Sequence, residues 1–236
     1  MRYNIATGTH VGRVREGNED AVYPVEDEST VGPVVVAVAD GMGGHAAGEV
    51  ASATAIRAAL EAASGSAVAR VEAANAAVLA AAAKNSARRG MGTTMTLAVF
   101  WPDGRLEMGH VGDSRAYLLR NERLTQLTID HTFVRELISQ GRLAPEEAAT
   151  HPRRHMLTRT VGMPNVRVDS LEIHLQPGDR VVLCSDGLTG MVADARITRI
   201  LSNTPAPTDA VWSLVEAANA AGGIDNTTVA VVDVAE

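Results

Sequence analysis

The chain has 236 residues, of which 46% are hydrophobic and 3% aromatic, and its 28 acidic and 21 basic residues give a net charge of −7. This composition can fill a sizeable core with Val, Leu, Ile and Ala, and one domain spanning residues 1–236 is expected. Nucleic acid and anionic membranes bind basic faces, so the charge argues against both as partners, whereas it permits divalent cations.

The cellular compartment is indicated by what the sequence lacks. No apolar run approaches the ~18 residues of a membrane span, and the first residues, MRYNIATGTHVGR, contain no apolar stretch of the kind found in signal peptides. A single cysteine, Cys184, cannot form an internal disulfide and suits a reducing compartment. We therefore expect a soluble, cytoplasmic protein, with a monomer as the default oligomeric state.

The predicted strands and helices come in groups along the chain. The apolar run VVVAVA predicts a buried strand over residues 34–39, and Ala-rich sequence predicts helices over 47–63 and 67–88. The later elements are expected, in order, as strands over 93–101, 105–113, 115–120 and 123–127, a short helix near 132–140, a helix beginning at Pro145, a strand over 179–186, helices near 194–202 and 208–221, and a last strand over 226–234. Because strands and helices do not alternate strictly, a layered sandwich fits this order better than a doubly wound sheet.

Acidic residues stand beside glycine or another small residue at one end of several predicted strands. A lone Asp-Gly pair is usually a turn and a lone Asp can cap a helix, so each acid also has a simpler explanation. Carboxylates gathered at one rim of a sheet would repel one another unless cations neutralised them, and hard ions such as Mg²⁺ or Mn²⁺ prefer oxygen ligands. The sequence therefore predicts a shared metal site, and the acids concerned are Asp40, Asp113, Asp186 and Asp225, together with Glu19 and Asp20 in the segment REGNED.

Seven segments follow one another along the chain: REGNEDAVY, VADGMGGHAAGEVAS, MGTTMTLAVF, HVGDSRAYLLR, LTIDHTFV, LCSDGL and GGIDNTTVAVV. In this order they resemble the metal-dependent protein phosphatases of the 2C (PPM) family, and in particular its compact bacterial serine/threonine branch. The resemblance covers essentially the whole chain. It implies an α+β fold, a four-layer α-β-β-α sandwich in which helix pairs flank two central antiparallel β-sheets, with a binuclear metal site at one edge.

The resemblance also implies a role for each acid in binding Mg²⁺ or Mn²⁺, two ions per chain. Asp40 would bridge both ions, and Gly41 would offer its carbonyl oxygen to one of them. Asp186 and Asp225 would complete the coordination of the other ion.

Three further acids match outer positions of the family's site. Glu19 and Asp20 match residues that hold metal-bound water molecules. Asp113, together with Asp186, matches the site of a third, weaker ion in bacterial members.

Arg15 stands five residues before Asp20, where the family has its phosphate-binding arginine. A planar guanidinium group suits two phosphate oxygens, and Arg13 is close enough in sequence to be a second candidate. With Asp40 and Asp186, Arg15 would form the catalytic set. The implied reaction is hydrolysis of a phosphomonoester by water that two metal ions activate, attacking phosphorus directly with no covalent intermediate.

The general acid is a departure from the family pattern. Animal-type members carry a histidine two residues after the bridging Asp, and this chain has Met42 there, which cannot donate a useful proton. His45 lies nearby in sequence, and a metal-bound water is the other candidate. Cys184 is not followed by the arginine that cysteine phosphatases need, so we expect a core cysteine. The remaining histidines considered form no spaced metal motif; they are His110, His131, His151, His155 and His174.

The irregular segment 131–165 matches the family's flap, which borders the cleft. Within its sequence HPRRH, Arg153 and Arg154 would give a basic lip for phosphopeptides, although a solvated charged loop explains them equally well. The hypothesis is that these two arginines affect substrate affinity more than turnover.

The sequence is compatible with three functions. The leading one is a phosphatase of phosphoserine and phosphothreonine proteins, whose partner is a cognate Ser/Thr kinase or the substrates of that kinase. A catalytically inactive binding module on the same fold should have lost metal ligands, whereas this sequence retains Asp40, Gly41, Asp186 and Asp225. A phosphatase of anti-sigma-factor antagonists usually carries sensor domains, and none is recognised in this sequence.

Overall fold

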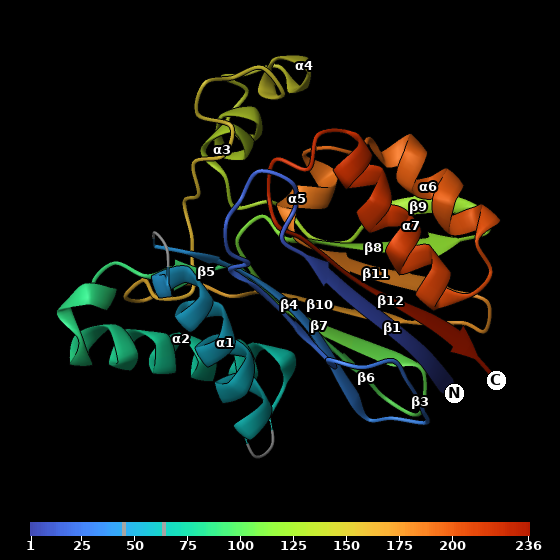
Figure 1. Cartoon of the computed structure of the whole chain (residues 1–236). Helices are drawn as coiled ribbons and strands as arrows, with labels where there is room; N and C mark the ends of the chain where they lie inside the picture. The colour runs from blue at the N-terminus through green and yellow to red at the C-terminus, as the bar shows by residue number, and fades with distance from the viewer. Residues whose placement is uncertain (44–45, 63–64) are drawn as a thin grey trace.

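The computed structural model of the chain describes residues 1–43, 46–62 and 65–236. Two β-sheets lie face to face, and helices cover the outer side of each, so the layers follow the order α-β-β-α (Figure 1). The predicted four-layer α+β sandwich with two antiparallel sheets is confirmed.

The first sheet has the strand order β3-β1-β12-β11-β8-β9. Its strands are β1 Arg2–His10, β3 Glu28–Thr30, β8 Arg115–Arg120, β9 Arg123–Gln126, β11 Arg180–Cys184 and β12 Thr227–Ala235. The strands nearest the two ends of the chain, β1 and β12, pair antiparallel along their whole length inside this sheet. β11 lies next to β12 and ends one residue before Ser185, at the end of the sheet where the acids gather.

The second sheet has the order β10-β7-β6-β4-β2, and the short β5 pairs with β4. Its strands are β2 Asp20–Tyr23, β4 Val34–Met42, β5 Gly92–Thr93, β6 Met95–Phe100, β7 Arg105–Val111 and β10 Asp169–His174. β4 is apolar at successive positions because both of its faces are covered. Val36 and Val38 face the other sheet, whereas Ala37 and Ala39 face the helices.

The helices form the two outer layers and the flap. They are α1 Ala46–Glu61, α2 Ala67–Lys84, a 3₁₀ turn Ser86–Arg88, α3 Phe133–Ser139, α4 Pro145–Ala148, α5 Asp186–Thr189, α6 Asp194–Asn203 and α7 Pro207–Ala220. α1 and α2 cover the second sheet, α6 and α7 cover the first, and α3 and α4 project away from both (Figure 1). Among the described helices, none combines the length and the apolar character that crossing a membrane requires.

Three apolar clusters hold the four layers together. The middle one lies between the sheets and includes Tyr3 and Phe100, whose rings are tilted with centroids 5.2 Å apart. The outer two join each sheet to its helices, largely through alanine and valine. Each fully buried Val or Leu side chain contributes about 1.5–3 kcal/mol to folding. Because the sheets dock through this middle cluster, side chains at their ends are brought together from distant parts of the sequence.

The structure adds and shortens some elements relative to the sequence analysis. The strands β1, β2, β3 and β10 were not predicted, and the helix expected over 67–88 ends at Lys84. Asn85 ends it, because its backbone is extended and its side chain accepts a hydrogen bond from Ala87 N at 3.0 Å. The strand expected over 93–101 is divided into β5 and β6 at Thr94.

Candidate functional site

Asp20 and Asp40 are paired residues on the neighbouring strands β2 and β4. Ser185, which follows β11 in the other sheet, donates its hydroxyl hydrogen to Asp20 Oδ2 at 2.8 Å, so the site spans both sheets. Asp20 Oδ1 is shielded from solvent and has no hydrogen-bond partner in the described part of the chain. Leaving a buried oxygen unpaired is costly, and this atom is a free ligand position within the site.

The backbone of Asp40 is fixed by two threonines that follow α2. Asp40 N donates to Thr94 Oγ1 at 2.9 Å, and the Asp40 carbonyl oxygen accepts from Thr94 N at 2.9 Å and from Thr93 Oγ1 at 2.8 Å. These hydrogen bonds fix the end of β4, where the glycine-rich sequence begins.

Gly41 must be glycine because other backbone lies against it. Its N–H donates to Glu19 O at 3.1 Å, and a Cβ on Gly41 would lie 2.2 Å from the Gly48 carbonyl oxygen. The Glu19 carbonyl also accepts from Ser52 Oγ at 2.6 Å, which ties the residue to α1. The carboxylate of Glu19 lies next to Gly48, since a Cβ there would be 2.5 Å from Glu19 Oε2.

Burial and mutual repulsion raise the pKa of three of the acids, Asp20, Asp40 and Asp113. Burial is the main cause of the high pKa of Asp40, which lies well above its ordinary value, and repulsion from Asp20, Asp186, Asp113 and Asp225 adds to it. Burial likewise raises the pKa of Asp20 to about 7 and that of Asp113 to about 7. Each is raised further by repulsion from Asp186. A pocket of this kind must take up protons or cations to become stable at neutral pH.

Asp225 is held by Arg15 at the rim of the pocket. Arg15 Nη2 lies 2.7 Å from Asp225 Oδ2, with 53% and 36% of the two side chains exposed. The hydrogen bond with Asp225 is the main cause of the raised pKa of Arg15, and Glu19 and Asp40 also contribute. Arg13 is exposed, and its backbone N–H donates to the Gly223 carbonyl oxygen at 2.7 Å. Of the two candidate arginines, Arg15 is therefore the one in contact with the acids.

Asn226 organises the loop that carries Arg15 and Glu19, and the sequence analysis did not identify it as a site residue. Its Oδ1 accepts from Glu19 N at 2.8 Å, and its Nδ2 donates to the carbonyl oxygens of Val11 at 2.8 Å and Gly17 at 2.9 Å. The position next to Asp225 was the only signal for it in the sequence.

Asp186 opens α5, directly after β11, and Ser185 rather than Asp186 is the N-cap of that helix. Asp113 lies in the turn between β7 and β8. The repulsion between Asp113 and Asp186 indicates that the two carboxylates share one region of the pocket.

His155, in the flap segment, reaches this region, and the sequence analysis gave it no role of its own. His155 Nδ1 lies 3.8 Å from Asp186 Oδ2, and the contact with Asp186 raises the pKa of His155. Arg153 and Arg154 are both exposed, and the Arg153 guanidinium lies 5.6 Å from the centre of the Phe133 ring.

The remaining candidates form no hydrogen bond or ion pair with the carboxylates of the site in the described part of the chain, or lie outside the described residues. His45 lies outside the described residues, and Met42 is partly buried at the end of β4. Cys184 is buried in β11, and burial raises the pKa of its thiol to about 12, so it remains protonated. His110 and His131 are buried beside the Asp113 turn, whereas His151 lies on the flap and His174 on β10.

The acids lie in one pocket, but no ion could be held by three of their side chains as they stand. In the described part of the chain, no three His, Cys, Asp or Glu side chains are close enough to share one metal ion. One reason that an ion lacks three such ligands is that Oδ2 of Asp225 is paired with Arg15. The arrangement is an anionic pocket with a guanidinium at its rim, which suits hard cations and an anionic group bound beside them.

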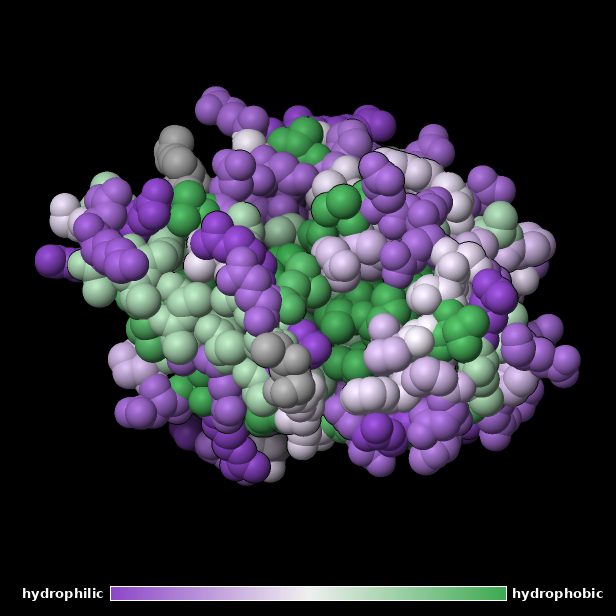
Figure 2. Space-filling model, turned by 90° about the horizontal axis from the view of Figure 1, so that it is seen from below, coloured by the Kyte–Doolittle hydropathy of each residue, from purple (hydrophilic) through white to green (hydrophobic). Residues whose placement is uncertain are grey.

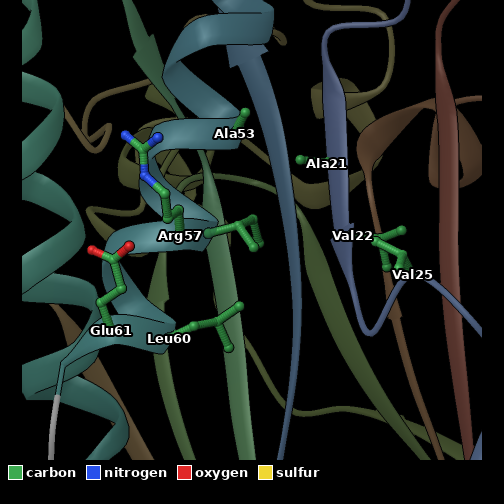
Figure 3. Close-up of a pocket in the computed structure, with 8 residues that line it drawn as sticks. Ala21, Val22, Val25, Ala53, Arg57, Leu60 and Glu61 are labelled. Carbon is green, nitrogen blue, oxygen red and sulfur yellow. The ribbon is translucent and has the colours of Figure 1, made fainter.

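A separate apolar groove of about 460 Å³ lies between α1 and the edge strand β2. Figure 2 shows apolar surface gathered near the middle of the face seen from below. In Figure 3, Leu60 points toward the strand side of the groove, and the charged ends of Arg57 and Glu61 point away from it. This groove contains none of the clustered acids.

Comparison with known proteins identifies relatives of the whole fold. The family model described as protein phosphatase 2C matches residues 7–222. The serine/threonine protein phosphatase PstP of Mycobacterium tuberculosis (strain H37Rv) is 42% identical over 244 residues, covering all of this chain and 45% of that protein. The serine/threonine phosphatase stp of Listeria innocua is 36% identical and covers 95% of this chain and 93% of its own length. The chain thus spans about half of the Mycobacterium relative and nearly all of the Listeria one.

Solved structures agree with these matches. The crystal structure of the M. tuberculosis serine/threonine phosphatase PstP has a TM-score of 0.90 and 39% identity, and the match covers 100% of both chains. A second structure, the PstP catalytic domain in complex with two manganese ions, has a TM-score of 0.87 and 39% identity over 100% of this chain and 99% of that one.

Proposed function

The chain belongs to the protein phosphatase 2C family, and from that membership we propose that it is a Mg²⁺- or Mn²⁺-dependent phosphatase of phosphoserine and phosphothreonine proteins. The observation that carries this proposal is the cluster of mutually repelling carboxylates with Arg15 paired to one of them at its rim. The manganese-bound structure of a relative 39% identical to this chain also supports it.

The residues present fit divalent cations. Asp20 Oδ1 is a buried oxygen without a partner among the described residues, and Asp20 and Asp40 have raised pKa values, which a bound cation would lower. In the proposal, Asp40 holds two ions, Gly41 contributes its carbonyl oxygen to one, and Asp186 and Asp225 hold the other. When bound, these ions lower the pKa of a water molecule that attacks phosphorus.

The outer acids complete the proposed arrangement. Glu19 and Asp20 hold water molecules that belong to the ions, and Asp113 with Asp186 holds a third, weaker ion. The raised pKa of Asp113 and its repulsion from Asp186 support this pairing.

Arg15 is the proposed phosphate-binding residue. Its guanidinium group donates to phosphoryl oxygens, whose negative charge replaces that of Asp225 as its partner. If Asp225 bound a cation, its carboxylate would no longer be available to Arg15, and the guanidinium would be free for phosphoryl oxygens. Arg15 then holds the phosphoryl group in place and balances charge on its oxygens.

The proposal extends to the organisation and setting of the protein. We propose that residues 1–236 form one phosphatase domain with its flap at 131–165, that it acts as a monomer, and that it opposes a Ser/Thr kinase in the cytoplasm. A free, buried thiol at Cys184 supports a reducing compartment.

The experiment is phosphate release from a panel of phosphoserine and phosphothreonine peptides, with Mn²⁺, with Mg²⁺ and with a chelator. We expect release with metal, none with chelator, and recovery when Mn²⁺ is restored. The Asp186→Asn variant should lose most activity, whereas Asp209→Asn, an exposed acid on α7, should not. Release that persists in chelator, or full activity of Asp186→Asn, would refute the proposal.

A further inference from the structure

Asp113 lies in a three-residue turn whose backbone is held on both sides. Gly112 has φ +110°, and a Cβ on it would lie 2.6 Å from Thr94 Cβ, so only glycine allows this turn to pack against Thr94. Ser114 Oγ lies 2.7 Å from Thr94 Oγ1, the same atom that accepts from Asp40 N. The backbone positions of Asp113 and Asp40 are therefore fixed relative to each other through Thr94.

His131 holds the other side of the turn through two hydrogen bonds to one residue. His131 N donates to the Gly112 carbonyl oxygen at 2.8 Å, and Gly112 N donates to His131 Nδ1 at 3.0 Å. Because Nδ1 accepts a hydrogen bond, it carries no proton, and the hydrogen of the neutral ring is on Nε2. His131 is 4% exposed, and burial lowers its pKa, which agrees with a neutral ring.

The opposite edge of the His131 ring faces the flap base, by which we mean Thr158 and Arg159 of the flap together with Asp169 at the start of β10. His131 Nε2 donates to Asp169 Oδ2 at 3.1 Å, and Arg159 Nη1 donates to Asp169 Oδ1 at 2.8 Å. Arg159 belongs to the returning half of the flap. Thr158 N also donates to the His131 carbonyl oxygen at 2.9 Å. One imidazole thus joins the flap base on one side to the Asp113 turn on the other.

The ring has no space to move away from these partners. His110 stacks on it with ring centroids 4.8 Å apart. His110 is itself buried, with Nδ1 2.9 Å from Thr96 Oγ1 and Nε2 3.1 Å from the Ile129 carbonyl oxygen. On the side of the acids, the ring of this buried, oriented histidine contacts the backbone of Gly112, next to Asp113, and so it acts on the position of that acid.

We infer that His131 is a positioning residue for Asp113, and that through it the flap base sets where the Asp113 carboxylate lies. The inference rests on the proposed function, in which Asp113 and Asp186 hold the third, weaker ion. It adds a regulatory link to that function, because a flap displacement that breaks the Arg159–Asp169 contact also loosens Asp113.

The test compares two substitutions of His131 for their effect on Mn²⁺ binding. His131→Leu removes both ring contacts, whereas His131→Asn keeps an acceptor near the position of Nδ1 and loses the contact with Asp169. Mn²⁺ titration calorimetry and the Mn²⁺ dependence of p-nitrophenyl phosphate hydrolysis are measured for both. We expect His131→Leu to weaken the weakest Mn²⁺ binding event about tenfold, as loss of outer support for a ligand commonly does, and His131→Asn to recover most of it.

A double-mutant cycle with Asp113→Asn distinguishes positioning from general damage. If His131 acts through Asp113, His131→Leu has no further effect on Mn²⁺ binding once Asp113 is Asn. The control is Asp179→Asn, which removes a buried acceptor of Arg120 at the opposite end of β11 and should reduce stability without changing Mn²⁺ binding. Should His131→Leu fail to fold, Asp169→Ala provides the second variant, with a smaller weakening expected.

Each outcome is decisive. Unchanged Mn²⁺ isotherms for His131→Leu, or for Asp169→Ala where His131→Leu does not fold, overturn the inference. So does an undiminished effect in the Asp113→Asn background, or an equal effect of Asp179→Asn. In these cases the parent chain still hydrolyses phosphopeptides, so the proposed function stands. If the parent chain releases no phosphate with any divalent ion, the proposed function fails and this inference fails with it.

Discussion

Arg15 and Asp225 form an ion pair across 210 residues of sequence, with Arg15 Nη2 2.7 Å from Asp225 Oδ2. Both side chains are partly exposed, so the pair adds little to stability. Its importance lies in the two groups themselves, because one is the proposed phosphate ligand and the other a proposed metal ligand.

Replacing Arg15 by Ala should therefore separate phosphate binding from metal binding. We predict that kcat/KM for phosphopeptides falls roughly 10- to 100-fold, the cost of losing a charge-assisted contact of about 1.5–3 kcal/mol. Mn²⁺ affinity should be unchanged or higher, because Asp225 is released. Steady-state kinetics and calorimetry check both. Arg13→Ala is the matched control, and a larger loss in Arg13→Ala would reverse the assignment of the two arginines.

The raised pKa values predict how stability without divalent ions depends on pH. Asp20 and Asp113 each have a pKa of about 7, against about 3.9 for an unfolded Asp. A carboxyl group that holds its proton more tightly when folded stabilises the fold fully at low pH, and this contribution is lost as the pH rises from about 4 to about 7. We predict that Mn²⁺ raises the melting temperature more at about pH 7.5 than at about pH 5.5. In Asp113→Asn the loss without ions should be smaller, and parallel curves for both proteins would contradict the prediction.

Asn226 should be needed for the loop over residues 11–19 to keep its shape. Asn226→Ala removes the partners of Glu19 N and of the Val11 and Gly17 carbonyl oxygens, so the free energy of unfolding should fall by roughly 2–4 kcal/mol. Urea denaturation gives this value. Mn²⁺-dependent hydrolysis should also weaken, because Arg15 and Glu19 lie on the loop. If the free energy of unfolding falls no more in Asn226→Ala than in a surface control such as Asn203→Ala, other contacts hold the loop.

The turn between β8 and β9 offers a stabilising change far from the acids. Asn121 and Glu122 have φ of 52° and 60°, as a type I′ turn requires, and Glu is poorly suited to the second of these positions. Glu122→Gly should raise the free energy of unfolding by about 1 kcal/mol, because glycine adopts a positive φ without strain. Thermal unfolding measures this, with unchanged kinetics as the internal control. Glu122→Ala, which keeps the strain, should give no such gain.

The flap arginines should act on peptide affinity. With Arg153 and Arg154 both changed to Ala, we predict a several-fold increase in KM for phosphopeptides and little change in kcat, since the two cations are exposed beside an anionic site. Hydrolysis of p-nitrophenyl phosphate, which has no peptide to contact, serves as the control. Equal kinetics of variant and parent on both substrates would remove the arginines from substrate binding.

Local pattern predicted much of this fold. The run VVVAVA in β4 and the Ala-rich sequence of α1 and α2 are local patterns that predict a strand and helices at these positions. β1 was missed because its sequence, RYNIATGTH, has no continuous apolar run, and it is specified by pairing with β12 more than two hundred residues later. β10 has alternating exposure, and it lies between the irregular segment 131–165 and the strand expected over 179–186, where no element was predicted.

In the candidate site too, features with a local sequence pattern could be predicted, whereas features that depend on long-range contacts could not. The acids could be named because each ends or begins a strand beside a small residue, and the pocket brings them together electrostatically. The residues that hold these acids in position could not be predicted from the sequence. Asn226 bonds to residues more than two hundred positions away, and His131 meets Gly112 and Asp169 only after the flap has folded back. Such contacts depend on tertiary arrangement, and sequence spacing alone does not contain them.

The hydrogen bond from Ser185 to Asp20 shows that the acids belong to neither sheet alone. Asp20 and Asp40 come from one layer and Asp186 from the other, and the layers are interleaved along the chain. A partial gene duplicate, or a loop grafted onto another scaffold, would inherit only a fraction of the pocket. The chemistry of the pocket therefore depends on the entire sandwich.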